Sequence, residues 1–139
     1  MKKVSEILLI LVLTFSFAGC FYSARVNKTE IIIESTSEFS EEEIYEAAKA
    51  VKEYFKENFR GCELKKLVFN QKDHETECEY QISQGHTKGN ILFFNHYSEI
   101  YCFWQNDESM EQGMTYEWSF TLVRKDENSP WEVISYGYA

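Results

Sequence analysis

The sequence predicts an α+β fold, in which one long N-terminal helix packs on a curved antiparallel sheet of about four strands. Apolar side chains recur every three or four residues between residues 39 and 59, which is the period of an amphipathic helix. Residues 116–123 instead alternate large apolar side chains with mostly small or polar ones, as in a strand with one buried face. Phe, Tyr and Trp make up 17% of the chain, which suits a β-rich core.

Residues 1–19 are predicted to be an export signal and no part of the fold. Lys2 and Lys3 precede an apolar run over residues 7–18, which is short for a membrane span but typical of a signal peptide. The run ends in Phe-Ala-Gly-Cys, which resembles the bacterial lipobox except that Phe17 replaces the usual Leu. We therefore expect Cys20 to carry lipid and to anchor the mature protein on the extracytoplasmic face of the cell membrane.

Two other fates of the N-terminus stay open. Ser16 and Ala18 also satisfy the rule for ordinary signal cleavage, which would release a secreted protein, and the segment could stay uncleaved as an anchor. Under the lipoprotein interpretation, residues 20–38 are the lipidated Cys and a polar tether, and residues 39–139 are a single domain. Residues 31–33 are three isoleucines, too apolar for a linker, so we expect a short strand or a segment laid on the domain; a partner-docking segment is the alternative.

The charge balance narrows the classes of partner. The formal net charge is −9, which argues against nucleic acid and against direct binding to anionic lipid. The chain has no phosphate-cradling glycine loop and no Gly-x-Ser-x-Gly elbow. The sequence thus points to no particular reaction, cofactor or catalytic residue.

Residue signals mark both ends of the helix predicted over residues 39–61. Ser40 and Glu43 form a capping box, and Phe39 can pack on Ile44 as a hydrophobic staple. Three glutamates at residues 41–43 suit the positive end of the helix dipole. Gly61 stands where a left-handed residue ends a helix.

The remaining elements follow in chain order. Residues 64–69 are predicted to form a strand at an exposed edge of the sheet. Residues 76–84 are predicted to form a short helix, although the alternation of Cys78, Tyr80 and Ile82 would also fit a strand. A strand begins at residue 90 and continues, bent, towards residue 104, before a loop over residues 105–114. The strands of residues 116–123 and 131–138 flank a turn at residues 125–130.

A set of landmarks in this order resembles a family of small clostridial-type lipoproteins and secreted proteins that carry a domain of unknown function. The landmarks are Phe39-Ser-Glu-Glu-Glu-Ile44, Tyr54-Phe55, Phe-Arg-Gly-Cys-Glu-Leu at residues 59–64, Tyr116-x-Trp118, Leu122-Val123-Arg124, Trp131-Glu132-Val133 and Tyr136-Gly137-Tyr138. The resemblance implies a cystatin-like, or nuclear-transport-factor-2-like, fold and no established activity. The chain departs from the pattern at residues 95–97 and at Cys102.

Three cysteines follow Cys20, namely Cys62, Cys78 and Cys102. An exported protein can form disulfides, and three cysteines allow one intramolecular pair, whose partners the sequence does not choose; small buried core residues are the alternative. His74 and Cys78 would share a helix face, with His86 or His96 near, but the spacing matches no standard zinc pattern. We expect no metal and no cofactor.

Aromatic side chains supply the best candidate ligand surface: His96, Tyr97, Tyr116, Trp118, Trp131 and Tyr136. The simpler expectation is that these rings fill the core against Ile44, Val51 and Phe55. We predict a non-enzymatic binding module with a cell-envelope protein or a small ligand as partner, besides the membrane reached through the lipid. The alternatives are an enzyme with a cavity lined by His96, Tyr97, Trp118 and Tyr136, and an accessory component that uses the loop of residues 105–114.

Overall fold

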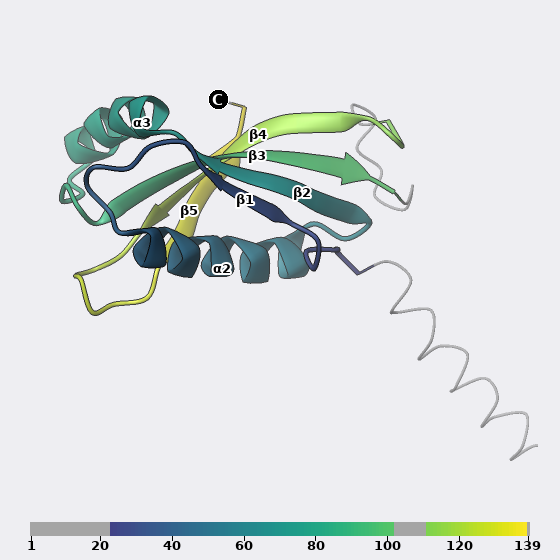
Figure 1. Ribbon diagram of the computed structural model, residues 1–139, viewed down its shortest axis with the longest axis horizontal. Helices are drawn as coiled ribbons and strands as arrows, with labels where there is room; N and C mark the ends of the chain where they lie inside the picture. The colour runs from purple at the N-terminus through teal and green to yellow at the C-terminus, as the bar shows by residue number, and fades with distance from the viewer. Residues whose placement is uncertain (1–22, 102–110, 139) are drawn as a thin grey trace, which may run out of the picture.

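The computed structural model describes residues 23–101 and 111–138, and it confirms the α+β class (Figure 1). A five-stranded sheet has one helix on each face (Figure 1). The elements are β1 (Glu30–Ile33), α2 (Glu41–Asn58), β2 (Cys62–Phe69), α3 (Gln71–Ser83), β3 (Ile91–Ile100), β4 (Thr115–Val123) and β5 (Glu132–Gly137).

The sheet differs from the expected one in its strand count and in its direction at one edge. The strands lie in sequence order, and β2 to β5 pair antiparallel as expected. β1 adds a fifth strand that pairs parallel with β2, with Ile31 opposite Leu67. The crossover between these parallel strands is α2, so the long helix follows a strand and does not begin the fold.

The folded domain also begins well before residue 39, inside the segment expected to be a tether. Arg25 bridges to Glu63, and the side chain of Val26 is only 5% exposed. Ile31 and Ile33 pack against the core, which confirms the short strand expected there. Burying these apolar side chains lowers the free energy of the folded state relative to leaving them in water. The pairing also satisfies the backbone N–H and C=O groups along the edge of β2.

Helix α2 has the predicted N-terminal cap. Backbone N–H of Glu43 donates to Oγ of Ser40 at 3.2 Å, and backbone N–H of Ser40 donates to Oε2 of Glu43 at 3.0 Å. The apolar face is buried against the sheet through Ile44, Ala47, Ala48, Val51 and Phe55. Gly61 adopts a φ of 75°, as the left-handed position after the helix requires.

Helix α3 is longer than the expected segment of residues 76–84, and the strand alternative is wrong. Asn70 caps it, because its Oδ1 accepts from the backbone N–H groups of Lys72 at 2.9 Å and Asp73 at 3.2 Å. Cys78 is buried as expected, but Tyr80 and Ile82 are 59% and 42% exposed. The buried side includes His74 and Gln81, two polar residues that an apolar-periodicity argument passes over.

The strands of the second half lie close to the predicted ranges. β3 continues unbroken to Ile100, and the turn between β4 and β5 covers the expected residues. The loop predicted over residues 105–114 falls mostly on residues 102–110, which lie outside the described part of the chain. In this arrangement, α2 ends at the same end of the sheet where β2 starts, β3 ends and β4 starts, and the turn after β4 lies at the opposite end (Figure 1).

Candidate functional site

The aromatic stripe of β4 is filled where it lies under α2. Phe120 is fully buried, and its ring stacks on His96 with centroids 4.3 Å apart. The rings of Tyr54 and Phe59 meet Phe120 at 6.1 and 5.9 Å. At this point the helix and sheet form a packed core, which is the simpler of the two expectations.

His96 is enclosed by rings. It is fully buried, with the rings of Phe55 and Trp118 each 6.3 Å from its own. Burial lowers the pKa of His96 to about 4, so the imidazole is neutral at pH 7. Neither of its ring nitrogens has a hydrogen-bond partner among the described residues, and nor does Nε1 of the neighbouring Trp118. The residue therefore cannot act as an accessible acid or base.

The six residues predicted to bind a ligand do not converge on one cavity. His96, Tyr116, Trp118 and Tyr136 lie near one another, with the rings of Trp118 and Tyr136 stacked at 6.3 Å. Tyr97 follows His96 in the strand and so faces the other side of the sheet, where its hydroxyl donates to Oε1 of Glu117 at 2.9 Å. Trp131 lies beside Arg124, after the turn that follows β4, away from the other five. The cavity expected to be lined by His96, Tyr97, Trp118 and Tyr136 does not form as predicted, because the sheet separates Tyr97 from the other three.

Glu38, which precedes α2, meets His74 and Cys78 of α3 in an order that resembles a catalytic triad. Sγ of Cys78 is 3.3 Å from Nε2 of His74, which is 3.5 Å from Oε2 of Glu38. Burial is the largest effect on both groups: it raises the pKa of Cys78 to about 11 and lowers the pKa of His74. A buried, protonated thiol is no nucleophile. No cluster suited to a metal ion occurs among the described residues.

The cysteines give no disulfide in the described residues, where Cys62 and Cys78 are both free. Cys62 opens β2 at one end of the sheet, whereas α3 begins only after β2 has ended at the other. The Cys62–Cys78 pairing left open by the sequence is therefore wrong. Cys20 and Cys102 lie outside the described residues.

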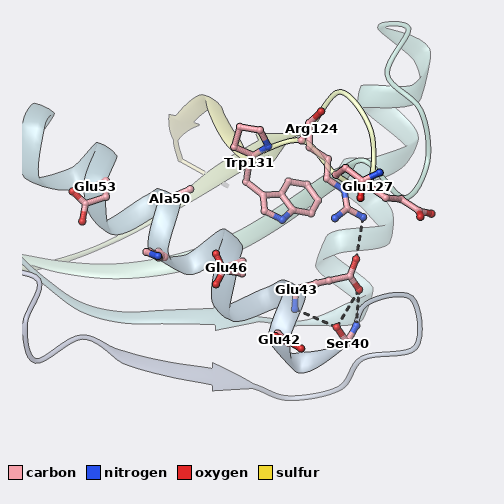
Figure 2. Close-up of a pocket in the computed structure, with 13 residues that line it drawn as sticks. Ser40, Glu42, Glu43, Glu46, Ala50, Glu53, Arg124, Glu127 and Trp131 are labelled. Carbon is pink, nitrogen blue, oxygen red and sulfur yellow. Dashed lines mark hydrogen bonds and ion pairs between the residues drawn. The ribbon is translucent and has the colours of Figure 1, made fainter.

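A groove that the sequence did not indicate runs between α2 and the turn after β4 (Figure 2). Its volume is about 650 Å³. It is lined by Ser40, Glu42, Glu43, Glu46, Lys49, Ala50, Glu53, Arg124, Glu127, Asn128, Ser129, Pro130 and Trp131. The start of α2 and the turn after β4, which contribute to its walls, lie at the end of the domain remote from the start of the described chain (Figure 1).

Arg124 holds the two walls of the groove together. Its Nη2 donates to Oε1 of Glu43 at 3.0 Å and to the backbone carbonyl of Gly89 at 3.1 Å. Its Nε donates to Oδ1 of Asn90 at 3.2 Å, and its guanidinium lies 4.5 Å from the centroid of the Trp131 ring. The side chain is only 7% exposed, so its charge stabilises the fold and is not available to a ligand.

The groove is acidic. Its lining includes five glutamates, whereas Lys49 is the only lining cation besides Arg124 among the described residues. Glu43 is engaged on both oxygens, and its pKa is lowered first by the Ser40 backbone N–H and further by Arg124. Glu42, Glu46 and Glu127 are exposed and make no ion pair with the described residues. They are free to meet a cation.

The wall opposite α2 presents Trp131, which is 8% exposed. One of its ring contacts is with Phe39, at 5.9 Å, on the core side. Figure 2 shows its indole nitrogen on the side of the ring that faces α2, and this N–H donor has no hydrogen-bond partner among the described residues. The groove therefore offers an unused donor beside unpaired carboxylates.

Sequence reasoning missed this groove because each of its parts has a structural explanation. The glutamates of residues 41–43 suit a helix start, and residues 125–130 suit a turn. A signal was nevertheless present: Glu42, Glu46, Lys49 and Glu53 are spaced as one stripe along the helix, with Ala50 as the small residue beside it.

A second hollow, of about 460 Å³, lies beside α3 on the other face of the sheet and is lined by Asp73, Thr76, Glu77, Phe93, Asn95, Glu117, Ser119 and Tyr138. Its carboxylates are already engaged: Asn95 donates to Asp73 at 2.8 Å, and Thr121 to Glu77 at 3.2 Å. The groove at Trp131 is accordingly the stronger candidate.

Comparisons with known proteins give no relative: the chain matches no family model, no curated protein and no solved structure. Within residues 23–101 and 111–138, no helix has the length and apolar character needed to cross a membrane.

Proposed function

We propose that the chain is a non-enzymatic binding module that lipid on Cys20 anchors to the outer face of the cell membrane, and that its groove between α2 and the β4–β5 turn takes a positively charged segment of a cell-envelope protein. The lipobox-like end of the apolar run supports the anchor. The observation that carries the binding role is the meeting of unpaired Glu42, Glu46 and Glu127 with the Trp131 indole in one groove.

The chemistry of the groove favours a Lys- or Arg-containing peptide. Exposed carboxylates attract an ammonium or guanidinium group and give it an orientation. The indole N–H is suited to a backbone carbonyl, and an amphipathic ring is a common anchor at protein interfaces. The exposed carboxylates are screened by salt, so binding should weaken as ionic strength rises.

The fold is proposed to be of the cystatin-like type that the family resemblance implies. Support comes from the long helix α2 packed along the antiparallel strands β2 to β5. The parallel strand β1 and helix α3 are additions to the expected plan.

Two measurements on the expressed full-length chain test the two parts of the proposal. Labelled fatty acid should enter the wild-type protein and leave Cys20→Ala unlabelled, with the variant lost from the membrane fraction; equal membrane retention would reject the lipid anchor, and release of unlabelled wild type would favour the secreted form. Calorimetric titration of the vesicle-bound protein should show binding of an oligolysine peptide and no binding of an oligoglutamate peptide of equal length. Equal response to both peptides would reject a cation-binding groove.

A further inference from the structure

β5 is an edge strand whose outer side is open. It is last in the order of the sheet, so no strand among the described residues pairs with its outer edge. An unpaired edge presents backbone N–H and C=O groups that an extended chain can use. Residues 131–138 contain no Lys or Arg to protect this edge, and Ile134 and Tyr136 are 42% and 51% exposed. The edge is therefore suited to receive a further strand.

The groove at Trp131 continues along this edge. Trp131, which lines the groove, directly precedes β5. Ala50, another lining residue, stands one helical turn before Tyr54, whose ring meets the Tyr136 ring of β5 at 6.1 Å. The Phe59 ring meets Tyr136 at 5.1 Å, so the end of α2 lies beside the later part of β5. One flank of α2 thus follows β5 from the groove to Tyr136.

A flexible peptide fits the edge better than a second copy of this chain does. Val133 and Ser135 pair with the consecutive residues Leu122 and Thr121, so Ile134 forms a bulge in β5. A bulge twists an edge and opposes its pairing with another rigid sheet, whereas a peptide can follow the twist. Two copies would also bring together two chains of net charge −9.

Charge selects which peptide is bound, a step that rests on the groove function proposed above. Glu42, Glu46 and Glu53 of α2 line the groove, and Glu127 lines it from the turn. Because α2 lies on one face of the sheet, a strand added to β5 meets the carboxylates of the helix from that face (Figure 1). Successive side chains of a strand point to opposite faces, so every second side chain of the added strand turns towards these carboxylates.

We propose that the partner segment adds to the outer edge of β5 as a sixth strand and carries Lys or Arg at alternate positions, which meet the carboxylates of the groove. Backbone hydrogen bonds to β5 hold the peptide, and the alternating cations set its register. The pairing covers the exposed side chains of Ile134 and Tyr136. The partner is thus an extended basic segment of a protein and not a helix.

N-methylated peptides test strand addition, because a methyl group on a backbone nitrogen removes one donor and leaves the side-chain charges unchanged. The probe, Lys-Thr-Lys-Thr-Lys-Thr-Lys, is titrated calorimetrically into the full-length chain in phosphatidylcholine vesicles. A strand directs its N–H groups alternately towards its neighbour and away from it, so methylation at the Lys positions and at the Thr positions blocks opposite edges of the peptide. One methylated peptide should bind at least about tenfold more weakly than the probe, and the other should bind like the probe.

The outcomes separate this proposal from the groove function. If neither oligolysine nor the probe binds, the groove function and strand addition are both overturned. If oligolysine binds but the two methylated peptides both bind like the probe, or both lose binding equally, only strand addition is overturned. A block peptide of the same composition, Lys-Lys-Lys-Lys-Thr-Thr-Thr, should bind about threefold more weakly than the probe, since it loses one or two exposed charge contacts. Equal binding of the block peptide would overturn the alternation.

A matched pair of variants assigns the peptide to β5. Ile134→Lys places a protective cation on the edge and should weaken binding of the probe at least about threefold by charge repulsion. Ile82→Lys, on α3, changes a side chain of the same 42% exposure and adds the same charge, and it should bind the probe like wild type. Circular dichroism checks that both variants are folded. Equal affinity of the two variants would place the peptide elsewhere and overturn the proposal.

Discussion

Glu43 and Arg124 are joined by a 3.0 Å hydrogen bond that crosses from the first turn of α2 to the chain just after β4. The other oxygen of the same carboxylate accepts from the backbone of Ser40 and completes the helix cap. One side chain thus links helix capping to the closure of the groove. The groove is therefore built on a rigid part of the fold.

The first prediction concerns this link. Arg124→Met should lower the free energy of unfolding by about 2 kcal/mol. The substitution removes a side chain that is only 7% exposed, and it leaves the carbonyl of Gly89 and Oδ1 of Asn90 without their donor. Urea denaturation measures the change. Lys125→Met, at an exposed neighbouring position, is the control and should change stability by less than about 0.5 kcal/mol. Equal effects in the two variants would show that the link is not stabilising.

The second prediction concerns pH. The ordinary pKa of a histidine is 6.5, and the pKa of His96 in the folded protein is about 4. Between pH 6.5 and pH 4, His96 binds a proton in the unfolded chain but not in the folded protein. The free energy of unfolding is therefore highest above pH 6.5 and falls as the pH drops towards 4. The loss attributable to His96 should be roughly 3 kcal/mol. Denaturation at pH 7 and pH 4.5 measures it, with His96→Met as the reference in which this part of the loss is absent.

The third prediction concerns the two unpaired nitrogens of His96. At pH 7, His96→Met should stabilise the protein by about 1 kcal/mol, because it replaces an unsatisfied polar ring by an apolar side chain of similar size. Thermal unfolding gives the sign directly. Destabilisation of this variant would mean that His96 has a polar partner in the protein in solution.

The fourth prediction tests where the domain begins. Val26→Ala should cost about 2 kcal/mol, because Val26 is 5% exposed and belongs to the core cluster. Asn27→Ala, at the exposed neighbouring position, should be close to neutral. If residues 20–38 were a free tether, both substitutions would be silent.

The sequence predicted the elements whose signals are local and missed the features that depend on long-range pairing. The cap of α2 and the strand of residues 116–123 follow from neighbouring side chains, and both were found. The pairing of β1 with β2 joins residues more than 30 positions apart, and no local pattern reports it. The length of α3 was underestimated because Asn70 and the buried His74 carry no apolar signal.

The candidate site was harder to predict than the fold. Alternation along β4 correctly grouped Tyr116, Trp118 and Phe120 on one face, but it could not tell a filled core from an open surface. Tyr97 was assigned to the wrong face because adjacent residues in a strand point to opposite sides. The groove depends on the approach of a turn to a helix 80 residues earlier in the chain, as the Glu43–Arg124 contact shows, and this approach exists only in three dimensions.

The central claim is that the groove at Trp131 binds cations through its unpaired carboxylates, and the most direct test is a calorimetric titration of the vesicle-bound protein with oligolysine. The double variant Glu46→Gln/Glu127→Gln should bind about tenfold more weakly than wild type, since each exposed carboxylate contributes about 0.5–1 kcal/mol. The charge-matched control Glu57→Gln/Glu79→Gln changes two exposed carboxylates outside the groove and should bind as wild type does. Equal weakening in the two double variants would contradict the claim, because it would mean that oligolysine responds to net charge alone.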